Sequence, residues 1–343
     1  MKILQEPCVF VGLDVHQDSI QICIINAAGK CLLNQRIANA VKPLISTIQR
    51  FGKQARIGLE ACGGAACLAD ALIQATGWSV QLTHAGYVQR MRQNPDKSDY
   101  SDAYLLADLV RVGYLPRVWL APPALRDLRH LVNYRQQLVD QNRKVKLRIR
   151  ALLREHRIRA PKYLWSGIGR QWLLSETTLP TQARWILERH VEELDRLSKA
   201  LSAVGNRLAE IAEKDTVMLQ LMAHRGIGLV TAVVFRAQVG DVGRFASGKQ
   251  LARFCGLSPC NASSGSRQGD AGLVRGCNKL LRATLIEAAH RLSVQDSRWK
   301  TFKQHMRERG KPGSLIAAAI ANRWVRRLYH DLIAERHVTL AVA

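Results

Sequence analysis

The fold of this chain is organised around the stretch NPDKSDYSDAYLLADLV, residues 94–110. Pro95 and the polar residues after it end any preceding element, and Ser98 or Asp99 is a suitable N-cap for a new helix. In the second half of the stretch, apolar residues recur at helical spacing. Asp99 and Asp102 are three residues apart and therefore share one face of the first turn.

Two carboxylates this close repel each other unless positive charge lies between them, and a divalent metal ion supplies such charge. The alternative is a solvated helix start, where acids interact favourably with the helix dipole. This stretch alone leaves both interpretations open.

The composition indicates a large globular protein with a polyanionic partner. The 343 residues are 47% hydrophobic, enough for two or three domains. Lys and Arg number 51 against 27 Asp and Glu, a formal net charge of +24, which favours nucleic acid first and an acidic membrane second. No apolar stretch is long enough to span a bilayer, and Glu6 and Pro7 argue against a signal peptide. We therefore expect a cytoplasmic protein.

The eight cysteines form no Cys-x-x-Cys pair, and several lie in apolar runs. We expect buried free thiols in a reducing compartment, with neither disulfides nor a zinc site.

The residues before the opening stretch predict an α/β domain. Short runs of β-forming residues alternate with helical spacing. The predicted strands are 8–15, 19–25, 31–37, 55–59 and 79–83, and the predicted helices are 41–51 and 65–76.

Two further acids occupy strands in this series. Asp14 interrupts the first strand and Glu60 ends the fourth. The order of elements resembles the ribonuclease H-like fold, in which the first and fourth strands are neighbours beside the acid-bearing helix. The resemblance implies that Asp14, Glu60, Asp99 and Asp102 converge and bind two Mg²⁺ ions, which would support phosphoryl transfer.

Structural roles remain as alternatives for each acid. Asp14 could be a strand-end turn residue, and Glu60 could cap the next helix. We interpret His16 and His84 as ordinary polar residues. Actin-like sugar kinases share this superfold, but Gly63-Gly64 is weak support for a phosphate loop and no second such loop is clear.

The middle of the chain predicts two long helices after a boundary at Pro122-Pro123. The first, 125–158, has an apolar seam of Leu138, Val145, Ile149 and Leu152 and a strongly positive face. That face is expected to bind phosphates, with a merely solvated surface as the alternative. Its candidate residues are Arg143, Lys144, Lys146, Arg148, Arg150 and Arg154. The second helix, 182–215, carries a heptad seam, so the two can form a coiled coil within one chain or between two.

The last third combines glycine turns with basic residues. Gly226-Ile227-Gly228 resembles the turn of a helix-hairpin-helix module, whose backbone N–H groups meet DNA phosphates. A Ser-Ser-Gly loop at 263–265 precedes further candidate phosphate ligands. These are Arg267, Arg275, Lys279 and Arg282. A serine beside such cations could attack phosphorus or be a turn residue. For the basic segment 307–330 we favour packing over a separate RNA contact.

Short motifs in both halves make the whole chain resemble the DEDD transposases of insertion-sequence family 110, a group known for RNA-guided recombination. The motifs are GLDVH at 12–16, LEA at 59–61, KSDYSDA at 97–103, GIG at 226–228, GLSP at 256–259, Ser264-Gly265, NKLLR at 278–282 and Gly310-Lys311. Two residues depart from the family pattern: Arg225 stands where proline is common, and Cys277 where glycine usually precedes the asparagine.

This resemblance implies a mechanism and its partners. The four acids would bind Mg²⁺, and Ser264 would be the nucleophile, with Ser263 as the fallback. The site would be composite, with the acids of one subunit facing the serine of another in a dimer or tetramer bridged by the coiled coil. Donor and target DNA and a structured guide RNA would be the partners, in the bacterial nucleoid.

From these observations we expect a DNA transposase that acts through a serine–phosphate intermediate. The alternatives are a metal-only, structure-selective endonuclease resembling a Holliday-junction resolvase, a non-catalytic nucleic-acid scaffold, and an actin-like kinase. The expected fold is α/β plus all-α, in four parts. These are a ribonuclease H-like domain at 1–120, basic and coiled-coil helices at 121–215, a mostly helical transposase domain with a helix-hairpin-helix-like element at 216–305, and a basic helical tail at 306–343.

Overall fold

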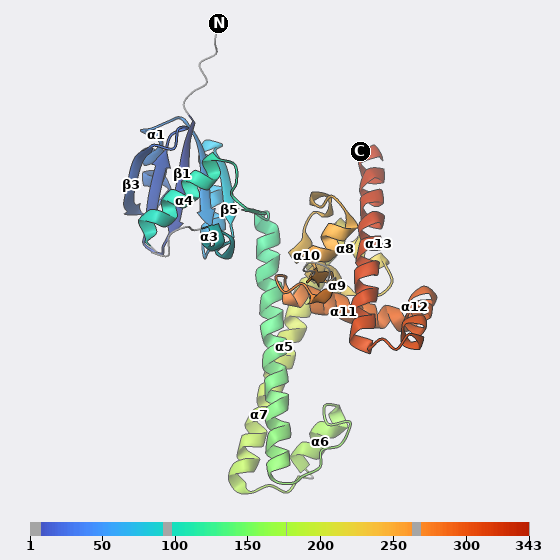
Figure 1. Ribbon diagram of the computed structural model, residues 1–343. Helices are drawn as coiled ribbons and strands as arrows, with labels where there is room; N and C mark the ends of the chain where they lie inside the picture. Colours follow the sequence, from blue (N-terminus) through green and yellow to red (C-terminus); the bar gives the residue numbers. More distant parts are fainter. Residues whose placement is uncertain (1–7, 92–97, 176, 263–268, 343) are drawn as a thin grey trace. The chain divides into compact units, whose positions relative to one another are not determined.

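A computed structural model describes residues 8–91, 98–175, 177–262 and 269–342 (Figure 1). The chain forms two compact units, Met1–Ala121 and Pro122–Ala343. The first is mixed α/β and the second is mostly helical, as the sequence predicts.

The first unit is built on a six-stranded sheet with strand order β3-β2-β1-β4-β5-β6. The chain order begins with an antiparallel meander, and β1 then pairs in parallel with β4. The elements are β1 Cys8–Val15, β2 Ser19–Ile25, β3 Cys31–Ala38, α1 Val41–Gln49, β4 Gln54–Glu60, α2 Ala65–Thr76, β5 Ser79–Thr83, α3 Ala85–Met91, α4 Asp99–Arg111 and β6 Arg117–Val118. All predicted strands and helices of this unit are present, whereas α3 and the two-residue β6 were not predicted.

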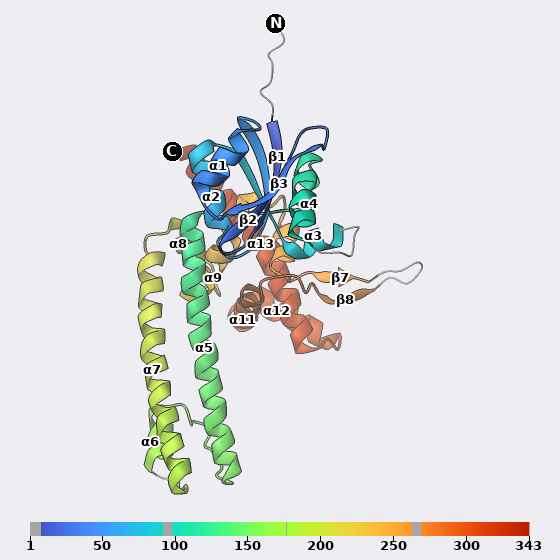
Figure 2. The same cartoon turned by 90° about the vertical axis from the view of Figure 1, so that its left-hand side faces the viewer.

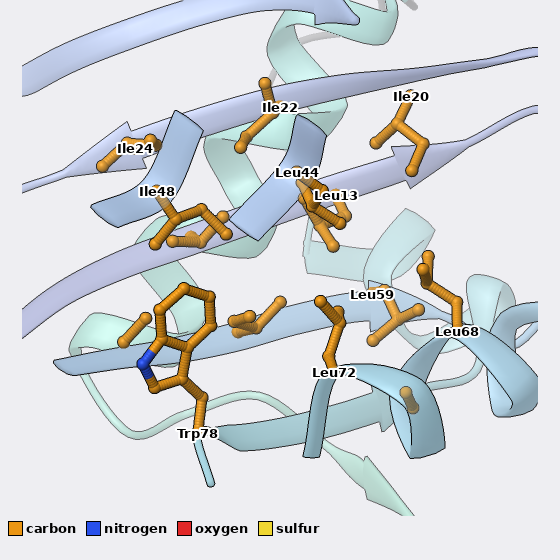
Figure 3. Close-up of a cluster of buried hydrophobic side chains, with 14 of the residues drawn as sticks. Leu13, Ile20, Ile22, Ile24, Leu44, Ile48, Leu59, Leu68, Leu72 and Trp78 are labelled. Carbon is orange, nitrogen blue, oxygen red and sulfur yellow. The ribbon is translucent and has the colours of Figure 1, made fainter. Parts of the chain in front are cut away.

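One face of the sheet carries the main hydrophobic core. Alternate residues of β1 and β4, including Leu13 and Leu59, point to this face because strand side chains alternate. Figure 3 shows them packed with Leu44 of α1 and Leu72 of α2. This core holds β1 and β4 side by side and so fixes where their last residues lie.

The opposite face of the sheet accepts α4 at very short range. Gly12 of β1 and Gly58 of β4 are partners in the parallel register. A Cβ atom on Gly12 would lie 1.9 Å from the carbonyl oxygen of Ala103 in α4, and one on Gly58 would lie 2.6 Å from Cγ2 of Val110. The two glycines therefore form the seat that allows α4 to contact the strands directly.

The second unit starts with a helical hairpin. Helix α5 (Pro123–Glu155) packs along α7 (Thr181–Ala212), and the short α6 (Gly167–Ser175) follows the first of them (Figures 1 and 2). The two helices pair within one chain, which is one of the two arrangements that the sequence allows. The α5 seam includes Leu138, Val145 and Ile149 as predicted, but Leu153 is buried where Leu152 was expected.

The remaining helices form the body of the second unit. They are α8 Thr216–Ala223, α9 Leu229–Val239, η1 Val242–Arg244, α10 Gly248–Phe254, α11 Lys279–Gln295, α12 Ser297–Glu308 and α13 Gly313–Val342, with strands β7 Pro259–Asn261 and β8 Asp270–Leu273. Gly226, between α8 and α9, has a φ of 83° and its missing Cβ makes room for Leu292. No helix in the described ranges has the length and apolar character needed to cross a membrane.

The expectation of buried cysteines was wrong for most of them. All eight are free, but only Cys23 and Cys255 are buried, while Cys31, Cys62 and Cys67 are exposed. Cys31 lies on β3, an edge strand of the sheet, and Cys62 follows β4 in a loop. An apolar neighbourhood in sequence did not predict burial at these strand edges and loops.

Candidate metal centre and nucleic-acid surfaces

A row of polar side chains crosses the α4 face of the sheet at one end. Asp14 of β1 is opposite Gln21 of β2, which is in turn opposite Arg36 of β3. On the other side, Glu60 of β4 follows the last registered pair with β1 and is opposite Thr83 of β5. The two strand acids therefore lie at neighbouring strand ends on the face that α4 covers.

The first turn of α4 supplies the other two acids. Ser98 caps the helix by accepting a hydrogen bond from the Ser101 backbone N–H, in a reciprocal capping box. Asp99 and Asp102 both lie in this turn, as predicted, and Asp102 is only 6% exposed.

Strand β3 fixes the position of this turn. Asn34 Nδ2 donates to the Tyr100 carbonyl at 3.1 Å, and Arg36 donates to Asp99 Oδ2 at 2.5 Å. Both contacts join β3 to the helix N-terminus across more than sixty residues of sequence. The carboxylate of Asp99 is thereby held over the sheet.

His16 is the functional candidate that the sequence interpretation set aside. Its Nε2 lies 3.4 Å from Asp14 Oδ2 and 3.3 Å from Asp99 Oδ2. Possible ligand atoms of these three residues lie within 4.8 Å of one another. An imidazole and two carboxylates are a suitable ligand set for a divalent cation. The signal in the sequence was the spacing Asp14-x-His16, which places the imidazole immediately beyond the strand.

Cys62 lies close enough to both strand acids for their negative charges to affect its thiol. Partial desolvation raises the pKa of the Cys62 thiol and a hydrogen bond from the Ala65 backbone lowers it, while the negative charges of Asp14 and Glu60 raise this pKa further. Its Sγ is 3.9 Å from the Val15 carbonyl oxygen. The three-residue group of possible ligands does not contain Glu60 or Asp102. The structure thus brings Asp14 and Asp99 within ligand distance and places Glu60 and Asp102 on the same face of the sheet.

The basic residues predicted to bind nucleic acid lie in the second unit. On α5, Arg143, Lys144, Arg148, Arg150 and Arg154 are exposed and Lys146 is half-buried. Lys146 and Arg150 both lie over the ring of Trp165, at 5.2 and 5.5 Å from its centroid. This arrangement holds part of the positive face against an aromatic side chain.

The candidate serine loop lies between β7 and β8. Ser263, Ser264 and Arg267 fall outside the described residues. Beyond β8, Arg275 and Lys279 are exposed, whereas Arg282 is half-buried and donates to the Val274 carbonyl at 2.8 Å. Asn278 caps α11 by accepting from the Leu281 backbone N–H, so the NKLLR motif begins a helix.

Two family models match the chain in its two halves. A model described as "Transposase", for the DEDD domain of IS110, matches residues 11–158. A second, described as "Transposase IS116/IS110/IS902 family", matches residues 218–304. Together they cover more than half of the chain. The chain belongs to the IS110/IS116/IS902 family of transposases.

Curated relatives align with this chain over nearly its whole length. The transposase for insertion sequence element IS1111A of Coxiella burnetii is 25% identical over 320 residues, 91% of this chain and 86% of the relative. A probable family 20 transposase of Pseudomonas aeruginosa is 25% identical over 95% of this chain and 97% of its own. The transposase for IS1328 of Yersinia enterocolitica is 23% identical, with 92% and 94% coverage. Transposases cut and rejoin DNA, so this family places the chain among DNA-processing enzymes.

Proposed function

We propose that this transposase cuts and rejoins DNA strands through a transient ester between Ser264 and a DNA phosphate, with Mg²⁺ held by Asp14, Glu60, Asp99 and Asp102. The observation that carries the proposal is the convergence of acids from β1, β4 and α4 on one face of the sheet. The strand order β3-β2-β1-β4-β5 supports a ribonuclease H-like assignment for this unit.

The side chains around the acids support cation binding. His16 lies between Asp14 and Asp99 and offers a nitrogen ligand at that point. Arg36 is paired with Asp99 Oδ2, so it neutralises one acid, and a bound cation would compete with Arg36 for this oxygen. When bound, a divalent ion would stabilise the negative charge that develops at a phosphate during strand transfer.

The serine step transfers the phosphoryl group twice. The Ser264 hydroxyl would lose its proton and bond to phosphorus, while one DNA P–O bond breaks and releases a strand end with a free hydroxyl. A hydroxyl of the partner strand would then attack the same phosphorus and release the serine. The resemblance to the family supports this role, and the exposed Arg275 and Lys279 beyond the loop supply cations suited to phosphate.

We further propose a guide RNA and a composite site between subunits. The net charge of +24 and the exposed basic face of α5 support binding of more than one nucleic acid. In this proposal, Ser264 of one subunit would act beside the acids of another, in a dimer or tetramer.

The test is strand cleavage of donor and target DNA with Mg²⁺ and the element's flanking RNA. We expect wild type to cut and to leave a covalent protein–DNA adduct. Ser264→Ala and Asp102→Asn should each lower cleavage by at least about a hundredfold, since each removes a group that acts in the transition state. The matched control is Asp108→Asn, because Asp108 lies on the same helix but is paired with Arg111.

The variants also separate the proposal from a metal-only endonuclease. If Ser264→Ala still cuts while Asp102→Asn does not, Ser264 is not the nucleophile and the chain is a metal-dependent nuclease. If Asp102→Asn cuts as well as Asp108→Asn, the acid cluster is not the catalytic centre.

A further inference from the structure

A basic groove lies between α12 and α13, in the second unit and on residues that the proposed chemistry does not use. Its volume is about 800 Å³. Its lining includes five arginines and two histidines. The arginines are Arg298, Arg309, Arg323, Arg326 and Arg327. Figure 1 shows α12 beside the first half of α13.

The positive charges of this groove have fewer carboxylate partners than those of the helical hairpin. No carboxylate is among its lining residues. Asp331 pairs with one of the lining arginines, Arg327, at 3.9 Å and in a partly exposed position, and Asp296 accepts hydrogen bonds from the backbone N–H groups of Arg298 and Trp299. Along α7, by contrast, Arg189, Arg196 and Arg207 each meet a glutamate within 2.9 Å. A concave surface with this excess of guanidinium groups suits a ligand with several phosphates.

The walls of the groove also contain planar groups. The guanidinium of Arg323 lies 4.7 Å from the centroid of the Phe302 ring, and that of Arg298 lies 5.5 Å from the Trp299 ring. Trp299 and Phe302 meet edge to face. A guanidinium stacked on an aromatic ring has a second flat face, and nucleic-acid bases stack on such faces.

We propose that this groove binds a single-stranded segment of nucleic acid, with its phosphates on the arginines and its unpaired bases against the arginine–aromatic wall. A duplex keeps its bases stacked inside and would offer the groove only its phosphates. The inference rests on the proposed function only in that the protein acts on nucleic acid.

The packing predicted for this segment holds on the other side of α13. Ile316, Ala317, Ile320 and Trp324 are buried, whereas Arg323 and Arg327 are exposed. The same helix can therefore pack through one face and bind a strand through the other.

The test is binding of a fluorescent 20-nucleotide single-stranded RNA to the full-length protein, followed by anisotropy at several salt concentrations. The double variant Arg298→Ala/Arg309→Ala removes two lining charges. We expect it to bind about tenfold more weakly. We also expect the slope of log affinity against log salt to fall by about 1.4, because each lost phosphate contact removes about 0.7 for a single strand.

The matched control is Lys300→Ala/Arg307→Ala, which removes the same charge from exposed positions of α12 that do not line the groove. Equal loss of affinity in both double variants would overturn the proposal, since net charge alone would then explain binding. A second variant, Arg323→Lys, keeps the charge and removes the planar group, so it should weaken the single strand more than a duplex of the same sequence. Equal weakening of both probes would overturn the single-strand assignment. Thermal melting of each variant verifies that it is folded.

The result is distinguishable from failure of the proposed catalysis. If the wild-type protein does not cut DNA but the groove variant selectively loses the single strand, only the catalytic proposal fails. If the protein cuts DNA and the groove variant binds like its control, only this inference fails.

Discussion

At the scale of single residues, the acid site depends on two positions without side chains. Gly12 and Gly58 are neighbours on parallel strands, and α4 occupies the space that their Cβ atoms would take. A side chain at position 12 would collide with the backbone of Ala103. Backbone atoms cannot rotate away as a flexible side chain can. The position of Asp99 and Asp102 over the sheet therefore depends on Gly12.

Gly12→Ala should move or detach α4 from β1. We expect a loss of about 1–3 kcal/mol in the free energy of unfolding, because the added methyl overpacks a closed contact. Urea unfolding followed by circular dichroism measures it. The matched control is Gly63→Ala in the same unit, where a new Cβ meets no atom within 4 Å and φ is not positive. Equal loss of stability in the two variants would contradict the close contact assigned to Gly12.

At the scale of elements, the α5–α7 hairpin joins an apolar seam to a positive surface. His190 of α7 is half-buried beside this surface. Burial lowers the pKa of His190, and the positive charge of Arg148 on α5 lowers this pKa further, although Glu193 opposes the shift. The neutral form of the imidazole is therefore the one that the folded hairpin favours.

The hairpin should lose stability as the pH falls below about 6.5, the usual pKa of histidine. The unfolded chain takes up its proton first, so it binds more protons than the folded chain in this range and stability rises with pH. The contribution is complete above about pH 6.5 and is lost as the pH falls through the lower folded pKa. Melting temperatures between pH 7.5 and 5 measure this effect.

His190→Gln should reduce this pH dependence, because the replacement does not titrate. The matched control is His130→Gln, at an exposed position on α5, which should keep the wild-type profile. A wild-type profile in His190→Gln would show that other groups cause the acid sensitivity.

At the scale of the whole molecule, the chain consists of two units with different contents. Met1–Ala121 carries the sheet and the acids, while Pro122–Ala343 carries the basic helices and the candidate serine loop. Each unit has its own buried residues. The candidate acids and the candidate serine therefore belong to different units of the chain.

The fragment Met1–Ala121 should fold without the rest of the chain, because it contains both cores on the two faces of the sheet. Circular dichroism and a cooperative thermal transition would show this. The control is a fragment ending at Met91, which lacks α4 and exposes the face around Gly12 and Gly58. It should not unfold cooperatively. A non-cooperative Met1–Ala121 would show that the first unit depends on the second.

The sequence by itself determined the elements of the first unit, except α3 and β6, and the order of its acids. Short runs of β-forming, mostly apolar residues define the strands of this unit. Ser98 begins α4 through a local capping box. These signals depend on residues close together in the chain. The resemblance to the ribonuclease H-like fold implied that the first and fourth strands are neighbours, and β1 and β4 do pair in parallel, with Asp14 and Glu60 at their ends.

Only the tertiary structure decided the contacts between distant residues. It brought His16 between Asp14 and Asp99, paired Arg36 with Asp99, and closed α5 against α7 within one chain. The groove between α12 and α13 likewise needs two helices to face each other. Periodicity shows which face of an element is apolar, but it does not show which distant polar residue lies opposite. That choice depends on how the packed elements meet in space.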